Sequence, residues 1–453
     1  MLSLKRSYAS IDTVVIISVI FFRLISTDSA NISFLIIAGF ALLGLRHAVI
    51  SLLLVFIFWS LNSGLVPTAS FSTIGRFIVL FFAFLSVLIH SRCFSLVKFD
   101  KFILITIVMG LFIGLHSLLL SQVIDVSLLK LSYWLVTFIT FFGAWKGLSP
   151  KLYNKLYNDI YYLLVLFLLI STIFINSPVG YLTNGSGFQG VLSHPQTFGV
   201  YAAILGSFSV ARLLSRMGNY NFDLFVFILS LFLILLSESR TALLSISTGY
   251  VMTFIIVQFF VPRHISQSVS VRKFRKVFLV VVATSIISIL SNIEYYDYFF
   301  SKSGATQTEN IVDAYVESRG VLFIPMLKNI NENPIGIGFG IASSESMIRI
   351  TRDPVFNLPI SAPIEKGNLY LAVLEELGLI GLLLFFAWLI FSYFRVVKKN
   401  LFGLPVFFTI LMLNFGESVL FSPGGVGALC IMMFTWSITA SKPLTSLGSN
   451  SSR

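Results

Sequence analysis

The chain is 453 residues long, with 57% hydrophobic residues, 11% charged residues and a formal net charge of +12. An ordinary soluble domain is about 25% charged, so this composition excludes a soluble globular protein and predicts an integral membrane protein. The basic residues stand in short segments between apolar runs, which indicates membrane topology and not a nucleic-acid-binding surface.

Apolar runs that are long enough to cross a bilayer recur along the chain, and the alternating segments of a membrane β-barrel are absent. The sequence therefore predicts an all-α polytopic integral membrane protein with about 14 transmembrane helices, in a range of about 12–14. We expect these spans near residues 11–25, 31–45, 48–62, 74–91, 100–120, 127–145, 159–176, 194–213, 222–237, 240–261, 276–291, 368–391, 402–420 and 424–440.

Lysine and arginine are concentrated in alternate loops of this arrangement. The positive-inside rule places those loops, and with them both termini, in the cytoplasm. The predicted organisation begins with residues 1–291, which hold the first eleven spans, followed by a loop over residues 292–367 on the outer side of the membrane. Residues 368–440 hold the last three spans, and residues 441–453 form a cytoplasmic tail.

The outer insert 292–367 is longer than an ordinary connecting loop, so we expect it to be partly helical. Residues 306–309 fit a capping box, and apolar residues follow at helical spacing over 311–326. The pair Asn333-Pro334 is expected to end that helix. Three alternating glycines in Pro334-Ile-Gly-Ile-Gly-Phe-Gly340 then permit sharp turns and close backbone approach.

Several basic residues face the predicted outer side, against the positive-inside rule, and are candidates for binding an anion. Arg240 lies in the tight turn Ser237-Glu-Ser-Arg-Thr between two spans. A guanidinium at the membrane surface suits a diphosphate, because it donates bidentate hydrogen bonds. An ion pair with Glu238, or contact with a lipid headgroup, is the alternative.

Two further arginines are weaker candidates for the same anion. Arg319 lies in the expected insert helix, where a solvated helix face is the alternative, and Arg76 lies at the outer start of a span, where snorkelling is the alternative. Arg23 and Lys130 we interpret as snorkelling side chains.

His194 opens a span directly before Pro195. Its side chain is a candidate for a base or a sugar contact, and a structural hydrogen-bonding role is the alternative. Asn368, Glu375 and Glu417 are polar groups at or inside predicted spans, where an ionisable residue is by default a functional candidate. Glu375 has the alternative role of tying two helices together. No metal-ligand spacing, P-loop, dinucleotide fingerprint or catalytic-serine motif is present, so we expect no metal and no cofactor.

Taken in chain order, these pieces resemble the bacterial O-antigen polymerase (Wzy) and O-antigen ligase superfamily. The resemblance covers roughly residues 185–425 and depends on the order and spacing of short motifs about one large outer loop. The motifs are His194-Pro-Gln-x-Phe-Gly199, Ser237-x-Ser-Arg240-Thr, Ser318-Arg319, Asn333-Pro-x-Gly-x-Gly338, Gly367-Asn-x-Tyr-Leu371, Glu376-x-Gly378-x-x-Gly381 and Glu417-Ser418.

The resemblance implies a membrane-embedded glycosyltransferase fold of the so-called C type (GT-C-like) at the periplasmic face of the bacterial inner membrane. The implied substrates are glycans linked to undecaprenyl diphosphate, within membrane lipid and with a chain-length regulator protein as a further partner. The ligases carry a histidine directly before the asparagine of the motif after the large loop, and that position is Gly367 here. This departure favours an O-antigen polymerase over an O-antigen ligase.

The implied reaction joins lipid-linked repeat units and releases undecaprenyl diphosphate. On this sequence Arg240 and Arg319 are expected at the diphosphate, with Arg76 as a third contact. Glu365 and then His194 are candidates for the base that activates the acceptor hydroxyl. The competing class is a lipid-linked glycan flippase or secondary transporter, but the internal repeats that are typical of transporters are not evident.

Overall fold

The computed structural model describes residues 2–67, 72–91, 100–183, 185–215, 218–260, 311–344, 349–353, 357–364 and 366–439. Side chains are described for all of these except residues 2–11, 72 and 311–321. The described chain is a bundle of helices with one small antiparallel hairpin, so the predicted all-α class holds apart from that hairpin.

The helices match the predicted spans closely. Thirteen predicted spans each coincide with a helix, and the span expected at 276–291 lies outside the described residues. The helices are α1 Leu2–Ile25, α2 Thr27–Ala41, α3 Leu45–Trp59, α4 Ser72–His90, α5 Lys101–Leu120, α6 Ile124–Gly147, α7 Pro150–Thr172, α8 Pro195–Ser215, α9 Tyr220–Leu236, α10 Arg240–Ile255 with the π turn Ile256–Phe260, α14 Ile311–Glu332, α15 Leu369–Lys399, α16 Leu404–Leu413 and α17 Val426–Thr439.

Fewer helices are long enough to cross a bilayer than the hydropathy of the sequence predicts. In the described part of the chain, seven helices are long and apolar enough to cross a bilayer, and five further apolar helices have 10–17 residues. The protein is therefore a multi-pass α-helical membrane protein, and the full set of about 14 spans stays a prediction.

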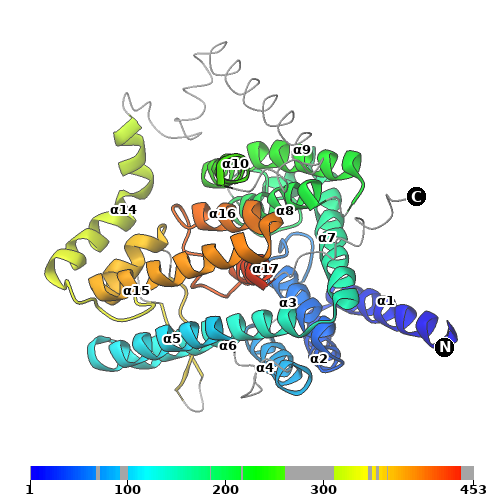
Figure 1. Cartoon of the computed structure of the whole chain (residues 1–453), viewed down its shortest axis with the longest axis horizontal. Coiled ribbons are helices and arrows are strands. Elements are labelled where there is room, and N and C mark those ends of the chain that lie inside the picture. The colour runs from blue at the N-terminus through cyan, green and yellow to red at the C-terminus, as the bar shows by residue number, and fades with distance from the viewer. Residues whose placement is uncertain are drawn as a thin grey trace, which may run out of the picture.

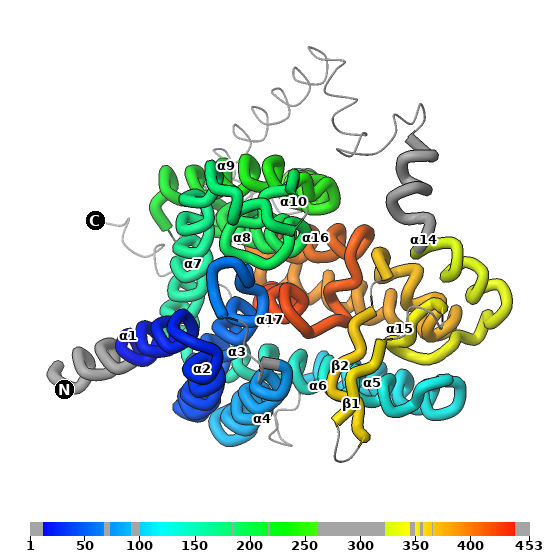
Figure 2. Tube along the Cα trace, turned by 180° about the vertical axis from the view of Figure 1, so that it is seen from behind, coloured from blue at the N-terminus to red at the C-terminus, as the bar shows by residue number. Residues whose placement is uncertain are grey.

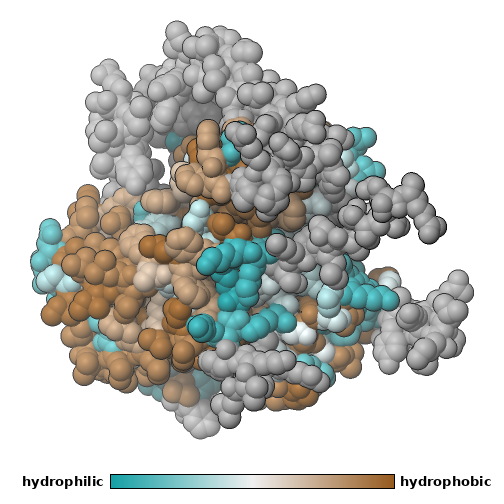
Figure 3. Space-filling model, in the orientation of Figure 1, coloured by the Kyte–Doolittle hydropathy of each residue, from teal (hydrophilic) through white to brown (hydrophobic). Residues whose placement is uncertain are grey.

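Exposed apolar rows identify the surface that faces lipid. On α5 the exposed side chains Leu104, Val108, Leu111 and Leu115 recur at helical spacing. On α15 a second row contains Leu379, Leu383, Ile390 and Phe394. Figure 3 shows a broad hydrophobic surface on the side of the molecule where Figure 1 places α5 and α15. In water such a surface would aggregate, whereas in a bilayer it matches the acyl chains.

The insert helix α14 ends at Glu332, immediately before Asn333-Pro334, as the sequence predicts. It packs against the start of α15, and both lie at one end of the bundle, whereas α1 begins at the opposite end (Figure 1). The hairpin of β1 (Thr351–Arg352) and β2 (Pro359–Ser361) lies against α4 and α6, as the view from behind shows (Figure 2). Parts of the insert therefore cover the same end of the bundle from two sides.

A buried ion cluster joins three long helices through Asp100. The Asp100 side chain caps α5 by accepting from the Phe102 N–H at 2.8 Å, and its two oxygens accept from Arg395 of α15 at 2.7 and 2.8 Å. Lys146 of α6 lies 2.7 Å away. Burial alone would raise the pKa of Asp100, but hydrogen bonds from Arg395 and Lys146 outweigh it and hold that pKa well below its ordinary value.

This cluster predicts loss of stability in acid. Because the folded pKa of Asp100 is depressed, its stabilising contribution is complete above the unfolded value of about pH 3.9 and is lost as the pH falls below it. Asp100→Asn should lower the unfolding free energy at pH 7 by about 3 kcal/mol, since it leaves two basic groups without their partner. The unfolding temperature in detergent at pH 7 and pH 3 measures both effects, and a pH dependence that is unchanged in the variant would contradict the assignment.

Candidate active site

A cavity of about 370 Å³ opens at the end of the bundle that the insert covers. Its walls come from the end of α3, the starts of α4, α6 and α8, the β2 strand and the first turns of α15. The remaining walls are residues 339–340, 362–364 and 366 of the insert and residues 418–425 between α16 and α17, a segment that is not helical. Most of these elements are distant in sequence, so the cavity exists only in the folded chain.

The segment after α16 corrects one predicted span. The expected helix over 402–420 ends at Leu413, and the next helix, α17, begins at Val426. Helix α16 is only 10 residues long, about half of what a bilayer requires. Non-helical backbone inside a membrane is tolerated where it lines a cavity. Most residues from Ser418 to Val426 line the cavity described above.

Helix α15 is interrupted beside the cavity. Gly378 has φ 67° and ψ −170°, so the helical hydrogen-bond pattern breaks there and the carbonyls of Glu375 and Glu376 lose helical partners. The insert supplies replacements: the Ile337 N–H donates to the Glu375 carbonyl at 3.1 Å, and the Gly338 N–H donates to the Glu376 carbonyl at 2.9 Å. The break is therefore satisfied by backbone from the insert.

Close approach of the two backbones explains the alternating glycines of the insert. Gly336 and Gly338 have φ of 105° and 108°, a region that side chains rarely adopt. A Cβ on Gly336 would lie 2.6 Å from the Glu376 carbonyl oxygen, and a Cβ on Gly378 would lie 2.3 Å from the Ile335 oxygen. The sequence prediction of sharp turns and close backbone approach is confirmed.

A buried polar network lies directly behind the break. The Lys366 ammonium is 2.5 Å from Glu375 Oε2, and both side chains are almost fully buried. Asn329 of α14 donates to Glu375 Oε1 at 2.7 Å, and Ser343 donates to Oε2 at 3.1 Å. Glu375 thus ties α15 to α14, which is the structural alternative that the sequence left open.

The neighbouring carboxylate has a different environment. Glu376 lines the cavity, and its Oε2 accepts from the Gly340 N–H at 2.7 Å. The carbonyl of the same glycine accepts from Lys130 Nζ at 2.8 Å. Lys130 and Lys366 also line the cavity, so two ammonium groups and one carboxylate meet there.

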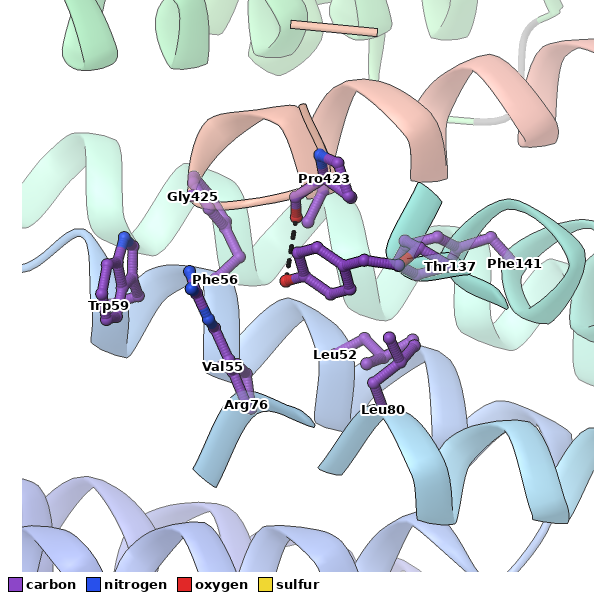
Figure 4. Close-up of a pocket in the computed structure, with 12 residues that line it drawn as sticks. Leu52, Val55, Phe56, Trp59, Arg76, Leu80, Thr137, Phe141, Pro423 and Gly425 are labelled. Carbon is purple, nitrogen blue, oxygen red and sulfur yellow. Dashed lines mark hydrogen bonds between the residues drawn. The ribbon is translucent and has the colours of Figure 1, made fainter. Parts of the chain in front are cut away.

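Arg76 faces the same cavity from an aromatic surround. Its guanidinium carbon lies 4.5 Å from the Trp59 ring centre, 5.2 Å from Phe77 and 5.7 Å from Tyr133. The Tyr133 hydroxyl donates to the Pro423 carbonyl at 3.3 Å, which fixes that ring (Figure 4). No acidic side chain lies within ion-pair distance of Arg76 in the part of the chain that the structure describes, so its charge is available to an anion.

Residues 225–386 match a family model described as O-antigen ligase. This segment, about a third of the chain, is thus similar to the O-antigen ligase family, which supports the O-antigen ligase and polymerase superfamily. No curated protein matches the chain. Members of the superfamily act as glycosyltransferases on lipid-linked glycans in membranes.

The superfamily segment supplies only part of the cavity. It contains Gly340, Lys366 and Glu376, together with the break in α15. Arg76 and Lys130 come from helices outside the match. The N-terminal helices therefore complete the site that the superfamily segment begins.

Arg240 is close to the cavity but does not line it. It opens α10 and is partly buried, and no hydrogen bond or ion pair of its side chain is found among the described residues. Glu238, the expected alternative partner, instead accepts from the Ser186 hydroxyl at 3.1 Å. The Arg240 turn packs closely on two cavity-forming segments, since a Cβ on Gly199 would meet Ser239 at 2.3 Å and one on Gly416 would meet Thr241 at 2.3 Å.

His194 has a local structural task. Its Nδ1 accepts from the Gln196 N–H at 3.2 Å at the start of α8, which requires a neutral ring with the proton on Nε2. Ser193 and Thr197 line the cavity, whereas His194 does not. The geometry thus favours the structural interpretation of this histidine.

The remaining predicted residues are dispersed. Asn368 caps α15 by accepting from the Tyr370 and Leu371 N–H groups, and it donates to the Phe415 carbonyl at 3.1 Å. Glu417 is partly buried beside Ser418 of the cavity wall. Glu365 lies outside the described residues, and Arg319 lies in α14 where side chains are not described.

Three residues of the cavity were not assigned a role in the site from the sequence: Lys130, Lys366 and Glu376, although Glu376 was a functional candidate as an ionisable residue at a predicted span. The snorkelling interpretation of Lys130 is wrong, because its ammonium bonds to Gly340 beside the cavity. Arg23 is also buried, and donates to the Pro67 carbonyl at 2.6 Å. The positive-inside rule could have identified two of these residues, because Lys130 and Lys366 are basic residues on the predicted outer side.

Proposed function

We propose that this protein is an O-antigen polymerase, which joins undecaprenyl-diphosphate-linked oligosaccharide repeat units at the periplasmic face of the bacterial inner membrane. The observation that carries the proposal is a cavity, formed in part by the segment that matches the O-antigen ligase family, that is lined by Lys130 and by Arg76, which has no acidic partner among the described residues. Gly367, at the position of the ligase histidine in the resembling motif, favours polymerase over ligase.

In the proposed reaction a hydroxyl on the acceptor's non-reducing sugar attacks the anomeric carbon of the donor. Undecaprenyl diphosphate leaves, and negative charge develops on its oxygens. Arg76 and Lys130 then stabilise the transition state more than the ground state, because the charge is larger there. Arg240 and Arg319 are proposed as further diphosphate or glycan contacts, and both termini are proposed to be cytoplasmic.

The first test is the lipopolysaccharide ladder of the native host after deletion of the gene. We expect a core that carries one repeat unit, and return of the ladder when the wild-type gene is supplied. A core without any repeat unit, with accumulation of lipid-linked polymer, would identify a ligase. An unchanged ladder would remove both assignments for this glycan and bring the transporter class forward.

A further inference from the structure

Glu376 lines the cavity, and one of its carboxylate oxygens has no hydrogen bond among the described residues. Glu376 is the one carboxylate among the described residues that line the cavity. Its Oε2 is held by the Gly340 N–H, whereas its Oε1 lies 3.6 Å from Lys366 Nζ, beyond hydrogen-bond distance. We propose that Glu376 is the general base that accepts the proton of the attacking sugar hydroxyl. This inference rests on the proposed function.

The adjacent carboxylate cannot take this role. Glu375 is fully buried, does not line the cavity, and accepts hydrogen bonds from Asn329, Ser343 and Lys366. Both of its oxygens are therefore engaged inside the protein, away from the cavity. Lys366 is held to Glu375 at 2.5 Å, which leaves Glu376 Oε1 available for a substrate hydroxyl.

The position of Glu376 is fixed at both backbone and side chain. Its carbonyl accepts from the Gly338 N–H at 2.9 Å, and its Oε2 accepts from the Gly340 N–H at 2.7 Å. The same insert segment thus holds the carboxylate at two points, beside the break at Gly378. A base that is held in this way needs little reorganisation when the acceptor arrives.

The base and the proposed leaving-group site share one volume. Arg76, Lys130 and Glu376 all line the 370 Å³ cavity, which is within the usual range for ligand sites. Lys130 is linked to Glu376 through Gly340, since it bonds to the carbonyl of that glycine while the N–H bonds to the carboxylate. Acceptor activation and stabilisation of the diphosphate can therefore occur together.

The step balances without any additional reactant. The acceptor O–H bond breaks as its proton moves to Glu376 Oε1, and the acceptor oxygen forms a bond to the anomeric carbon. The bond between that carbon and the diphosphate oxygen breaks, and its electron pair stays on undecaprenyl diphosphate. Glu376 is left as a neutral carboxylic acid and returns its proton to water after the products depart.

The test uses full-length protein in detergent with the lipid-linked repeat unit isolated from the deletion strain. Glu376→Gln keeps an oxygen for the Gly340 N–H but removes the base, so kcat should fall by about 10²–10⁴-fold. The KM should change little, and the rise in unfolding temperature caused by undecaprenyl diphosphate should persist. Glu376→Asp should give an intermediate kcat. A kcat for Glu376→Gln within tenfold of wild type would overturn the assignment.

Two controls separate folding and function. If Glu376→Gln lowers the unfolding temperature, its kcat is measured per molecule that still binds undecaprenyl diphosphate, and a kcat within tenfold of wild type would overturn the proposal. If the wild-type protein and the Glu376→Gln variant both elongate the glycan, only the assignment of Glu376 as the base is overturned. Wild-type protein that neither elongates the glycan nor gains stability from undecaprenyl diphosphate would overturn the proposed function as well.

Discussion

Replacing Arg76 by alanine is expected to abolish chain elongation while the protein stays folded. Arg76 has no acidic partner among the described residues, so its removal strands no opposite charge. Loss of one preformed cation at a developing oxyanion typically lowers kcat by about 10²–10³-fold. The rate of elongation with purified protein, and the ladder length in complemented cells at matched protein levels, measure this effect.

The matched comparison is with a basic residue away from the cavity. Lys328 on α14 has a side chain that is 71% exposed and pairs only with Glu332 at 3.7 Å, so Lys328→Ala should leave elongation unchanged. Arg76→Lys should recover only part of the rate, because lysine lacks the planar group that stacks on Trp59. Full activity of Arg76→Ala would remove this residue from the proposed diphosphate site.

Replacing Lys366 by methionine is expected to destabilise the protein by about 3–5 kcal/mol. The change leaves Glu375 charged and fully buried without its ammonium partner. The unfolding temperature in detergent and the abundance of the variant in membranes should both fall. The effect should exceed that of Lys328→Ala, which breaks only an exposed pair.

A second substitution tests the physical cause of that loss. The double variant Lys366→Met with Glu375→Gln removes both charges, so it should regain a large part of the unfolding temperature. The amide introduced by Glu375→Gln would still offer an oxygen to Asn329, which in the wild-type chain bonds to Glu375 at 2.7 Å. A double variant that is no more stable than Lys366→Met would show that the ion pair is not the source of the loss.

The helices of this protein follow from local sequence because their determinants are local. Helix α5 begins at Lys101 because Asp100 caps it, and its apolar residues continue without interruption to Leu120. Helix α14 ends at Glu332 because Asn333-Pro334 follows. Hydropathy therefore predicted α5, and the pair Asn333-Pro334 predicted the end of α14.

The site is less predictable because its determinants are tertiary. A single glycine such as Gly378 within an apolar run is usually tolerated in a helix. It breaks α15 here because Ile337 and Gly338 supply hydrogen bonds from another part of the chain. Likewise, the predicted orientation put Lys130 on the outer side, but only the position of Gly340 brings its ammonium to a cavity.

The break in α15 also has a consequence for biogenesis. A helix with two carbonyl groups that lack hydrogen-bond donors is unfavourable in free energy inside lipid, because no water is present to donate to them. The donors, Ile337 and Gly338, precede α15 in the chain, so they are synthesised first. In the proposed topology the insert has therefore been translocated before α15 leaves the insertion machinery. The insert can dock as the helix enters the bilayer, and so serves as a built-in assembly factor for the span that follows it.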